Sequence, residues 1–149
     1  MTATVFVDTN VLVYWREAAN PEKQGVADDW LKLLWKQRSG RLSSQVLHEY
    51  YVTVTDKLEP GLSRELARRD IRRLLAWLPV AGSGPVLEHA WALQDRYRLP
   101  WWDALIAAAA RGASCTWLLS EDFQDGQDLD GVRVVNPFLH EPREIAAPQ

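Results

Sequence analysis

Residues 5–12, with the sequence VFVDTNVL, contain the pattern that decides the fold. Three apolar residues end abruptly on an acid, a hydroxyl and an amide, and a second apolar pair follows. This pattern predicts a buried strand with Asp8 at its carboxyl end, followed by a helix. In open α/β sheets, ligands bind at the carboxyl edge of the strands. We therefore expect the Asp8 carboxylate to lie at a functional site.

The same pattern recurs later in the chain. A second buried strand is predicted at residues 116–119, and it also ends on polar residues, which include Asp122. Two further acids, Glu49 and Asp103, occur on predicted helices. Four carboxylates gathered at one point repel each other unless a cation lies between them. Hard divalent cations prefer oxygen ligands, and magnesium usually also contacts a substrate phosphate. The four acids, Asp8 among them, therefore predict metal-dependent phosphate chemistry.

Length and composition narrow the class of protein. The chain has 149 residues, of which 47% are hydrophobic and 25% charged, so one globular domain with a sizeable core is expected. No apolar run approaches the ~20 residues that span a bilayer. The first residues do not show the basic stretch followed by an apolar stretch that is typical of a signal peptide, so none is expected. The single cysteine, Cys115, cannot form an internal disulfide, which fits a reducing compartment. We therefore expect a cytoplasmic protein with no membrane span.

The net charge of −3 is unusual for a protein that binds nucleic acid. Once the four site acids are set aside, the rest of the chain carries +1, so the acidity is partly local. Five arginines lie between residues 64 and 73. They form either a solvated helix face or a contact for RNA phosphates, and the sequence leaves both alternatives open.

Strands alternate with helices, which predicts a parallel sheet. The expected fold is α/β, a three-layer α/β/α sandwich with a small, mainly parallel sheet. One domain is expected over residues 1–138, followed by a loose, proline-rich tail at 139–149. Asn20, Ser44 and Ser63 are expected to cap helices. The predicted strands are 4–7, 41–44, 79–81, 116–119 and 132–135, and the predicted helices are 10–17, 21–38, 45–57, 64–78, 85–98 and 103–111.

Four segments follow one another in a particular order: VDTN at 7–10, the isolated acid Glu49, WDALIAA at 102–108, and LLSEDF at 118–123. In this order and at these spacings they resemble the segments of PIN domains, specifically the compact VapC-type ribonuclease toxins of toxin–antitoxin pairs. The resemblance covers about residues 4–138. It implies metal-dependent RNA cleavage, magnesium or manganese as the cofactor, an antitoxin as protein partner, and a homodimer.

The resemblance also assigns roles to the acids. Asp8 and Asp103 would hold the first magnesium ion directly, and Glu49 and Asp122 would complete the site through water or a second ion. Four further residues are candidates for a surrounding set that orients these ligands, namely Thr9, Asn10, Ser120 and Asp125.

Each acid also has a plainer interpretation. Asp8 would cap the following helix, and Asp103 would interact favourably with the dipole of its own helix. Glu49 points away from the apolar stripe of its helix, where a solvated acid is the usual finding. Asp122 and Asp125 would be turn residues.

The function that these observations favour is a magnesium-dependent endoribonuclease that hydrolyses RNA phosphodiesters with metal-activated water. One alternative is a non-catalytic PIN-like module that binds RNA or protein. Another is a phosphatase with Asp8 as nucleophile, although such enzymes usually carry a second acid two residues later, where this chain has Asn10. The sequence leaves transfer RNA, a ribosomal loop and messenger RNA open as substrates.

Overall fold

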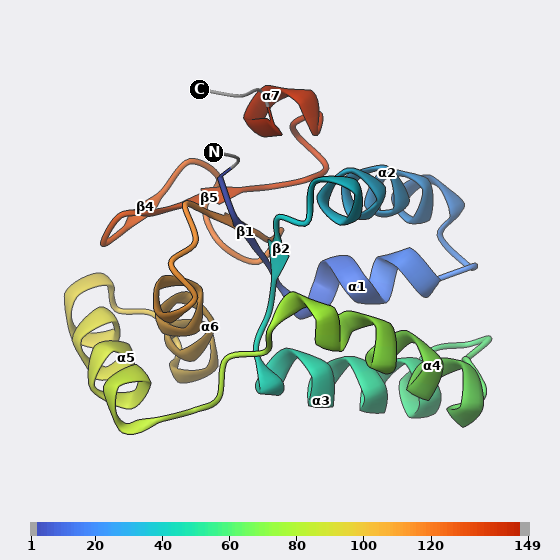
Figure 1. Cartoon of the computed structure of the whole chain (residues 1–149), viewed down its shortest axis with the longest axis horizontal. Coiled ribbons are helices and arrows are strands. Elements are labelled where there is room, and N and C mark those ends of the chain that lie inside the picture. Colours follow the sequence, from blue (N-terminus) through green and yellow to red (C-terminus); the bar gives the residue numbers. More distant parts are fainter. Residues whose placement is uncertain (1–2, 147–149) are drawn as a thin grey trace.

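The computed structural model describes residues 3–146, which fold around a five-stranded sheet (Figure 1). The strand order is β2-β1-β3-β5-β4, and every neighbouring pair is parallel except β4 and β5, which are antiparallel. The predicted mainly parallel sheet is confirmed, and β4 is an edge strand that the sequence pattern did not predict. The strands are β1 (Val5–Val7), β2 (Gly40–Arg41), β3 (Trp117–Leu119), β4 (Asp128–Leu129) and β5 (Val132–Val135).

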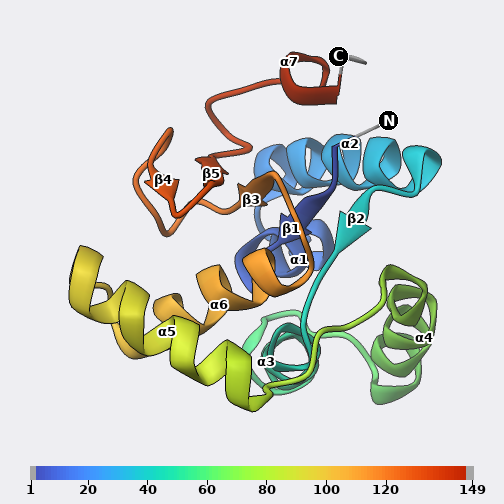
Figure 2. The ribbon, with the colours of Figure 1, turned by 60° about the vertical axis from the view of Figure 1, so that its left-hand side comes forward.

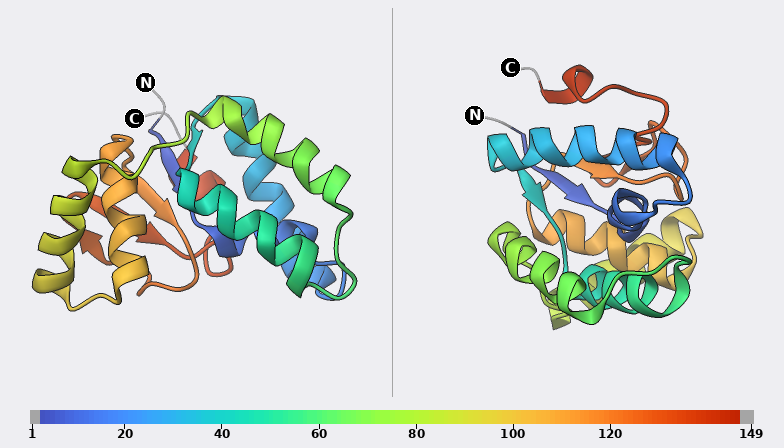
Figure 3. Two further views of the ribbon diagram at one scale, coloured as in Figure 1. Left: turned by 90° about the horizontal axis from the view of Figure 1, so that it is seen from below. Right: turned by 90° about the vertical axis from the view of Figure 1, so that its right-hand side faces the viewer.

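Helices cover both faces of the sheet, as the predicted three-layer arrangement requires. Figure 2 shows α2 (Pro21–Gln37) on one side and the pair α5 (Gly84–Tyr97) and α6 (Trp101–Gly112) on the other. Both views in Figure 3 show α5 and α6 side by side. The remaining helical elements are α1 (Thr9–Arg16), α3 (Ser44–Val52) with its π-helical continuation η1 (Thr53–Lys57), α4 (Arg64–Leu74) with the 3₁₀ turn η2 (Leu75–Trp77), and α7 (Arg143–Ala146).

Side-chain caps fix where three of the helices begin. Asn20 accepts a hydrogen bond from the Lys23 N–H at 3.3 Å, with Pro21 as the first residue of α2. Ser63 caps α4 as predicted. The predicted cap at Ser44 is wrong: Ser43, in an extended conformation, accepts from the third residue of α3, whereas Ser44 is already helical.

Small side chains allow α6 to lie close to the sheet. Alanines dominate its buried face, and the helix contacts β3 and β5. A similar close approach occurs at Gly40, where a Cβ atom would lie 2.5 Å from the ring of Trp77. The close packing of α6 against β3 and β5 positions the start of this helix relative to the sheet edge.

The chain around residue 138 makes hydrogen bonds to the rest of the fold. The Trp30 indole N–H donates to the Pro137 carbonyl at 3.0 Å, and His140 Nε2 lies 2.7 Å from the Asp125 carboxylate. Helix α7 lies in the segment that the proline-rich sequence predicted to be loose, and residues 147–149 of that segment lie outside the described residues. Between residues 3 and 146, no helix is long and apolar enough to cross a membrane.

Candidate active site

The Asp8 carboxylate lies at the carboxyl edge of the sheet, between β1 and β3. These strands are parallel with Val7 opposite Leu119, so the residues that follow, Asp8 and Ser120, come together. The Ser120 hydroxyl donates to one Asp8 oxygen at 2.7 Å, and the Thr9 N–H donates to the other at 2.7 Å. Asp8 is only 5% exposed and is also the N-cap of α1. The capping role and the position at the sheet edge therefore coexist in one side chain.

Asn10 links Asp8 to Asp122. Its amide nitrogen lies 3.3 Å from Asp8 Oδ2, 3.1 Å from Ser120 Oγ and 3.2 Å from Asp122 Oδ2. An amide has two hydrogens, so it donates to two of these three acceptors at a time. The Glu121 N–H in turn donates to Asn10 Oδ1 at 3.3 Å. Asn10 thus ties the loop after β3 to α1 and places donor hydrogens between two acids.

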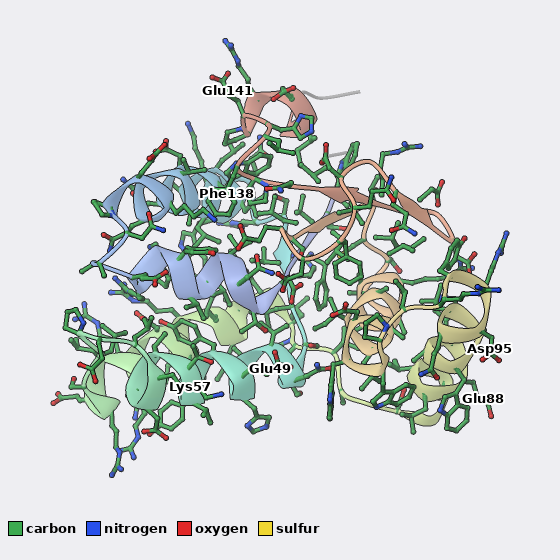
Figure 4. The ribbon with its side chains drawn as sticks, turned by 180° about the vertical axis from the view of Figure 1, so that it is seen from behind. Glu49, Lys57, Glu88, Asp95, Phe138 and Glu141 are labelled. Atoms are coloured by element: carbon green, nitrogen blue, oxygen red, sulfur yellow. The ribbon has the colours of Figure 1, made fainter. Side chains whose placement is uncertain are left out.

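Glu49 reaches the same place from α3. It is exposed, and the Thr9 hydroxyl donates to its Oε2 atom at 3.0 Å. One turn earlier on the helix, the Gln45 amide donates to Oε1 at 2.6 Å. Figure 4 shows Glu49 on the part of α3 that lies alongside α1. The glutamate is therefore exposed, but its hydrogen bond with Thr9 places one of its oxygens beside the sheet edge.

Asp103 approaches from the first turn of α6. Its side chain is half-buried, and burial raises the pKa of the carboxyl, with a further contribution from the negative charges of Asp122 and Glu49. The four acids therefore share one electrostatic environment. Among the described residues, no side chain or N–H group donates a hydrogen bond to the Asp103 carboxylate, which leaves its oxygens available to another partner.

Burial and the neighbouring acids raise the proton affinity of Asp8. The pKa of Asp8 is raised to about 7, chiefly by burial. The negative charges of Asp122 and Glu49 raise it further, whereas the hydrogen bonds from Ser120 and Thr9 lower it. None of the salt bridges in the described part of the chain includes Asp8, Glu49, Asp103 or Asp122. The site is therefore an uncompensated cluster of negative charge.

Chemically, this cluster suits a hard divalent cation. It offers carboxylate oxygens from four separate elements and has no basic side chain paired with them. Within residues 3–146, no three His, Cys, Asp or Glu side chains converge tightly enough to form a metal cluster as they stand. Asn10 and Ser120 both donate hydrogen bonds to the Asp8 Oδ2 atom. The residues that could hold a cation are Asp8, Glu49, Asp103 and Asp122.

Asp125 is not brought into this network. One of its oxygens accepts from the Asn136 N–H at 2.9 Å, and the other pairs with His140. The predicted surrounding residues Thr9, Asn10 and Ser120 all make hydrogen bonds to a site acid, whereas those of Asp125 join its loop to the C-terminal segment.

Two residues beside the site had no sequence signal. The Tyr14 hydroxyl and the Lys23 ammonium both donate to Glu121, the latter at 2.9 Å. Lys23 also lies 4.6 Å from the centre of the Tyr14 ring and 4.7 Å from that of Phe138. These contacts fix Glu121 beside Asp122. They join residues about a hundred positions apart, which no local pattern predicts.

The raised pKa of Asp8 gives a pH-dependent stability. The folded protein binds the Asp8 proton more tightly than the unfolded chain, so the free energy of unfolding falls as the pH rises from about 4 to about 7. Asp8→Asn cannot ionise. In chelator, its stability advantage over the wild type is therefore expected to be larger at pH 8 than at pH 5, by on the order of 2 kcal/mol. Urea unfolding at both pH values measures this difference.

The matched control is Asp95→Asn, an exposed acid on α5 that Figure 4 shows far from Glu49. The difference in the free energy of unfolding between Asp95→Asn and the wild type should be the same at both pH values. An equal difference for Asp8→Asn would show that the Asp8 carboxylate ionises as easily in the folded protein as in the unfolded chain.

The family model of the PIN domain matches residues 5–128, which is most of the chain. The chain belongs to the PIN-domain family. PIN domains are usually nucleases, and PIN nucleases typically use metal ions. No curated protein matches the chain in sequence.

Solved structures share the fold of this PIN domain at about 20% identity. A toxin–antitoxin complex from Klebsiella pneumoniae is 21% identical, with a TM-score of 0.62 over 93% of this chain and 99% of the other. The FitAB complex bound to a DNA fragment is 20% identical, with a TM-score of 0.66 over 91% and 96%. VapC20 of Mycobacterium tuberculosis, a sarcin–ricin loop cleaving toxin, is 21% identical, with a TM-score of 0.59 over 80% and 92%. The predicted resemblance to VapC-type toxins is confirmed at the level of family and fold.

Proposed function

We propose that this PIN domain is a magnesium-dependent endoribonuclease, the toxin of a toxin–antitoxin pair, that acts in the cytoplasm. The observation that carries the proposal is electrostatic: Asp8 and Asp103 both feel the negative charges of Asp122 and Glu49, and no salt bridge among the described residues compensates these four acids. Asp8 follows β1, Glu49 lies on α3, Asp103 lies in the first turn of α6 and Asp122 follows β3. A polyanionic substrate cannot approach such a site unless a cation reverses its charge.

In this proposal Asp8 and Asp103 hold the ion, and Glu49 and Asp122 complete the site. Bound Mg²⁺ or Mn²⁺ supplies a water of lowered pKa and stabilises charge on the phosphoryl oxygens. Ser120 and Asn10 fix the orientation of Asp8 through their hydrogen bonds to Oδ2. Thr9 holds Glu49 in the same way through its hydroxyl. These uncharged donors orient the acids without neutralising them.

Incubation with a mixed RNA pool tests the proposal against its alternatives. Cleavage in magnesium that stops in chelator supports the nuclease. RNA binding without cleavage would instead indicate a non-catalytic module. Hydrolysis of a phosphate monoester through an aspartyl phosphate would indicate a phosphatase with Asp8 as nucleophile. Against the phosphatase stands Asn10, whose amide donates towards Asp8 where such enzymes usually carry a second acid.

The toxin assignment has its own prediction. We expect the chain to arrest bacterial growth on induction and a small protein encoded beside it to relieve the arrest. The solved complexes of the same fold contain an antitoxin with the toxin, which supports this expectation. The antitoxin would direct a basic side chain at Asp8 and Asp103, since a positive charge there would offset the repulsion among the acids. We also expect the toxin to be a homodimer.

Co-expression with the neighbouring gene, scored by colony formation, measures the relief. Charge reversal of the partner's basic residue should restore toxicity. Toxicity that no neighbouring product neutralises would contradict the toxin assignment and leave the nuclease assignment intact.

A further inference from the structure

Beside the four acids lies a groove of about 690 Å³, which we call the Trp102 groove. We infer that it binds single-stranded RNA, with the Trp102 indole stacked on a base next to the cleaved phosphate and Lys57 contacting the backbone. The inference rests on the proposed ribonuclease function and adds to it the path and form of the substrate. The groove is lined by Gln45, His48, Glu49, Val52, Thr53, Lys57 and Trp102.

Trp102 is placed as a platform for a base. It is 64% exposed, although tryptophan is usually largely buried. It directly precedes Asp103 in the first turn of α6, so its backbone lies next to that of a site acid. No aromatic ring or cation stacks on Trp102 among residues 3–146, in contrast to Trp91, which stacks on Trp101. An exposed, unstacked indole at the edge of a nuclease site is suited to an unpaired base.

The opposite wall of the groove is a polar row on α3 and η1. Gln45, Glu49, Thr53 and Lys57 follow one another at four-residue spacing, which places them on one helix face. The chain stays helical past Thr53 through a π-type bond, in which the Leu58 N–H donates to the Thr53 carbonyl at 3.0 Å. Figure 4 shows Glu49 and Lys57 along this one helical run. The row therefore leads from the acids to a lysine.

Charge favours this groove over the other hollow at the site. That hollow, of about 500 Å³, shares Glu49 and Thr53 but is also lined by Glu17, Glu121 and Asp122. In the Trp102 groove, Lys57 and His48 face the solvent, and neither makes a salt bridge within the described residues. Because phosphate contacts dominate the affinity for nucleic acids, the strand should follow the groove that offers the ammonium group of Lys57.

Stacking and backbone contact together define the substrate. A base can stack on Trp102 only when it is unpaired and turned outwards, so the groove selects a single strand or a loop and excludes a regular duplex. Shape and stacking tolerate all four bases, and hence the groove sets the form of the RNA more than its sequence.

The test is the affinity of a short unstructured RNA, measured by fluorescence anisotropy in calcium. Trp102→Ala is expected to weaken binding roughly 5-fold to 100-fold, and Trp102→Phe to restore most of it. Lys57→Gln should weaken binding and lower the slope of log affinity against log salt by about one. Trp35→Ala, at an exposed tryptophan outside the groove, is the matched control and should bind as the wild type does.

An abasic nucleotide moved along the RNA locates the stacked base. At one position the abasic nucleotide should weaken RNA binding to the wild type but cause no further loss of affinity in Trp102→Ala. This non-additivity is expected of two groups in direct contact. A regular RNA duplex should be insensitive to Trp102→Ala.

Three outcomes would overturn the inference. If Trp102→Ala binds RNA as tightly as the wild type and still cleaves it in magnesium, RNA does not bind in the Trp102 groove, and the proposed ribonuclease function is unaffected. A changed oligomeric mass of Trp102→Ala by light scattering, again with unchanged RNA affinity, assigns this face to a second copy of the chain. If the wild type neither binds nor cleaves RNA, both the proposed ribonuclease function and the proposed role of the groove are wrong.

Discussion

Asp103→Asn and Asp8→Asn should each reduce kcat/KM for RNA cleavage on the order of 1000-fold or more, while the chain stays folded. Each substitution removes one charged oxygen from the proposed cation site. The Asp103 carboxylate receives no hydrogen bond from the described residues, so no structural contact is lost with it. Removing a like charge relieves repulsion with Asp122 and Glu49, and hence the melting temperature in chelator should hold or rise.

Cleavage rates at saturating magnesium, together with melting curves in chelator, measure both parts of this prediction. Asp95→Asn removes an equally acidic group on α5 and should cleave as the wild type does. Activity near that of the wild type in either site variant would contradict the ligand assignment. Loss of activity with a collapsed melting temperature would instead mean that the side chain is structural.

The position of Asp8 was predictable because its causes are local. A buried strand that ends on an acid needs only the apolar run before it and a parallel neighbour beside it. β3 ends in the same way, and the register of Val7 with Leu119 brings the two polar ends together. The small residues of α6 likewise predicted a helix close to the sheet. In both cases the pattern and its consequence lie within a few residues of each other.

Glu49 shows where the sequence is insufficient. The helix pattern indicates only that its side chain avoids the core, and solvent is the usual environment there. Its place in the cluster comes from the angle at which α3 packs against α1, recorded by the hydrogen bond from Thr9 across forty positions. Only the family resemblance supplied that placement. The edge strand β4 escaped prediction for another reason, since two residues are too few to show an alternating pattern.

Helix α4 also contains a buried residue that the sequence did not predict. Its five arginines are exposed, and the two sequence-based interpretations of this helix, a solvated face or an RNA contact, concerned only those arginines. The structure adds that Asp70, between them in sequence, is only 3% exposed and meets Arg16 of α1 and Tyr50 of α3. A charged residue in a charged helix gives no sign of burial, because its partner lies 54 positions away.

Asp70 joins three helices through a buried network. Arg16 donates two hydrogen bonds to its carboxylate, at 2.8 and 2.6 Å, and the Tyr50 hydroxyl donates at 2.6 Å. Burial and the charge of Asp70 raise the pKa of the Tyr50 hydroxyl, so it stays protonated and remains a donor. The network fixes α4 and α3 against α1, the helix that Asp8 caps.

Arg16→Met is therefore expected to lower the free energy of unfolding by about 3 kcal/mol. Methionine keeps much of the volume of arginine but leaves the Asp70 charge buried with Tyr50 as its remaining donor, and an uncompensated buried charge costs about 3–5 kcal/mol. The lower end applies because the Arg16 side chain is 31% exposed, which lets water reach the vacated place. Urea unfolding at neutral pH measures the loss.

Arg96→Met is the matched control for this loss. Arg96 also forms an ion pair, at 2.7 Å with Asp130, but its side chain is 67% exposed, so the expected cost is below about 1 kcal/mol. The double variant Arg16→Met/Asp70→Asn should recover part of the stability, because it removes the stranded charge. Equal losses in the free energy of unfolding for Arg16→Met and Arg96→Met would show that the burial of Asp70 does not increase the cost of removing its arginine partner. A double variant less stable than Arg16→Met alone would locate the energy in the hydrogen bond to Tyr50 instead of in the charge.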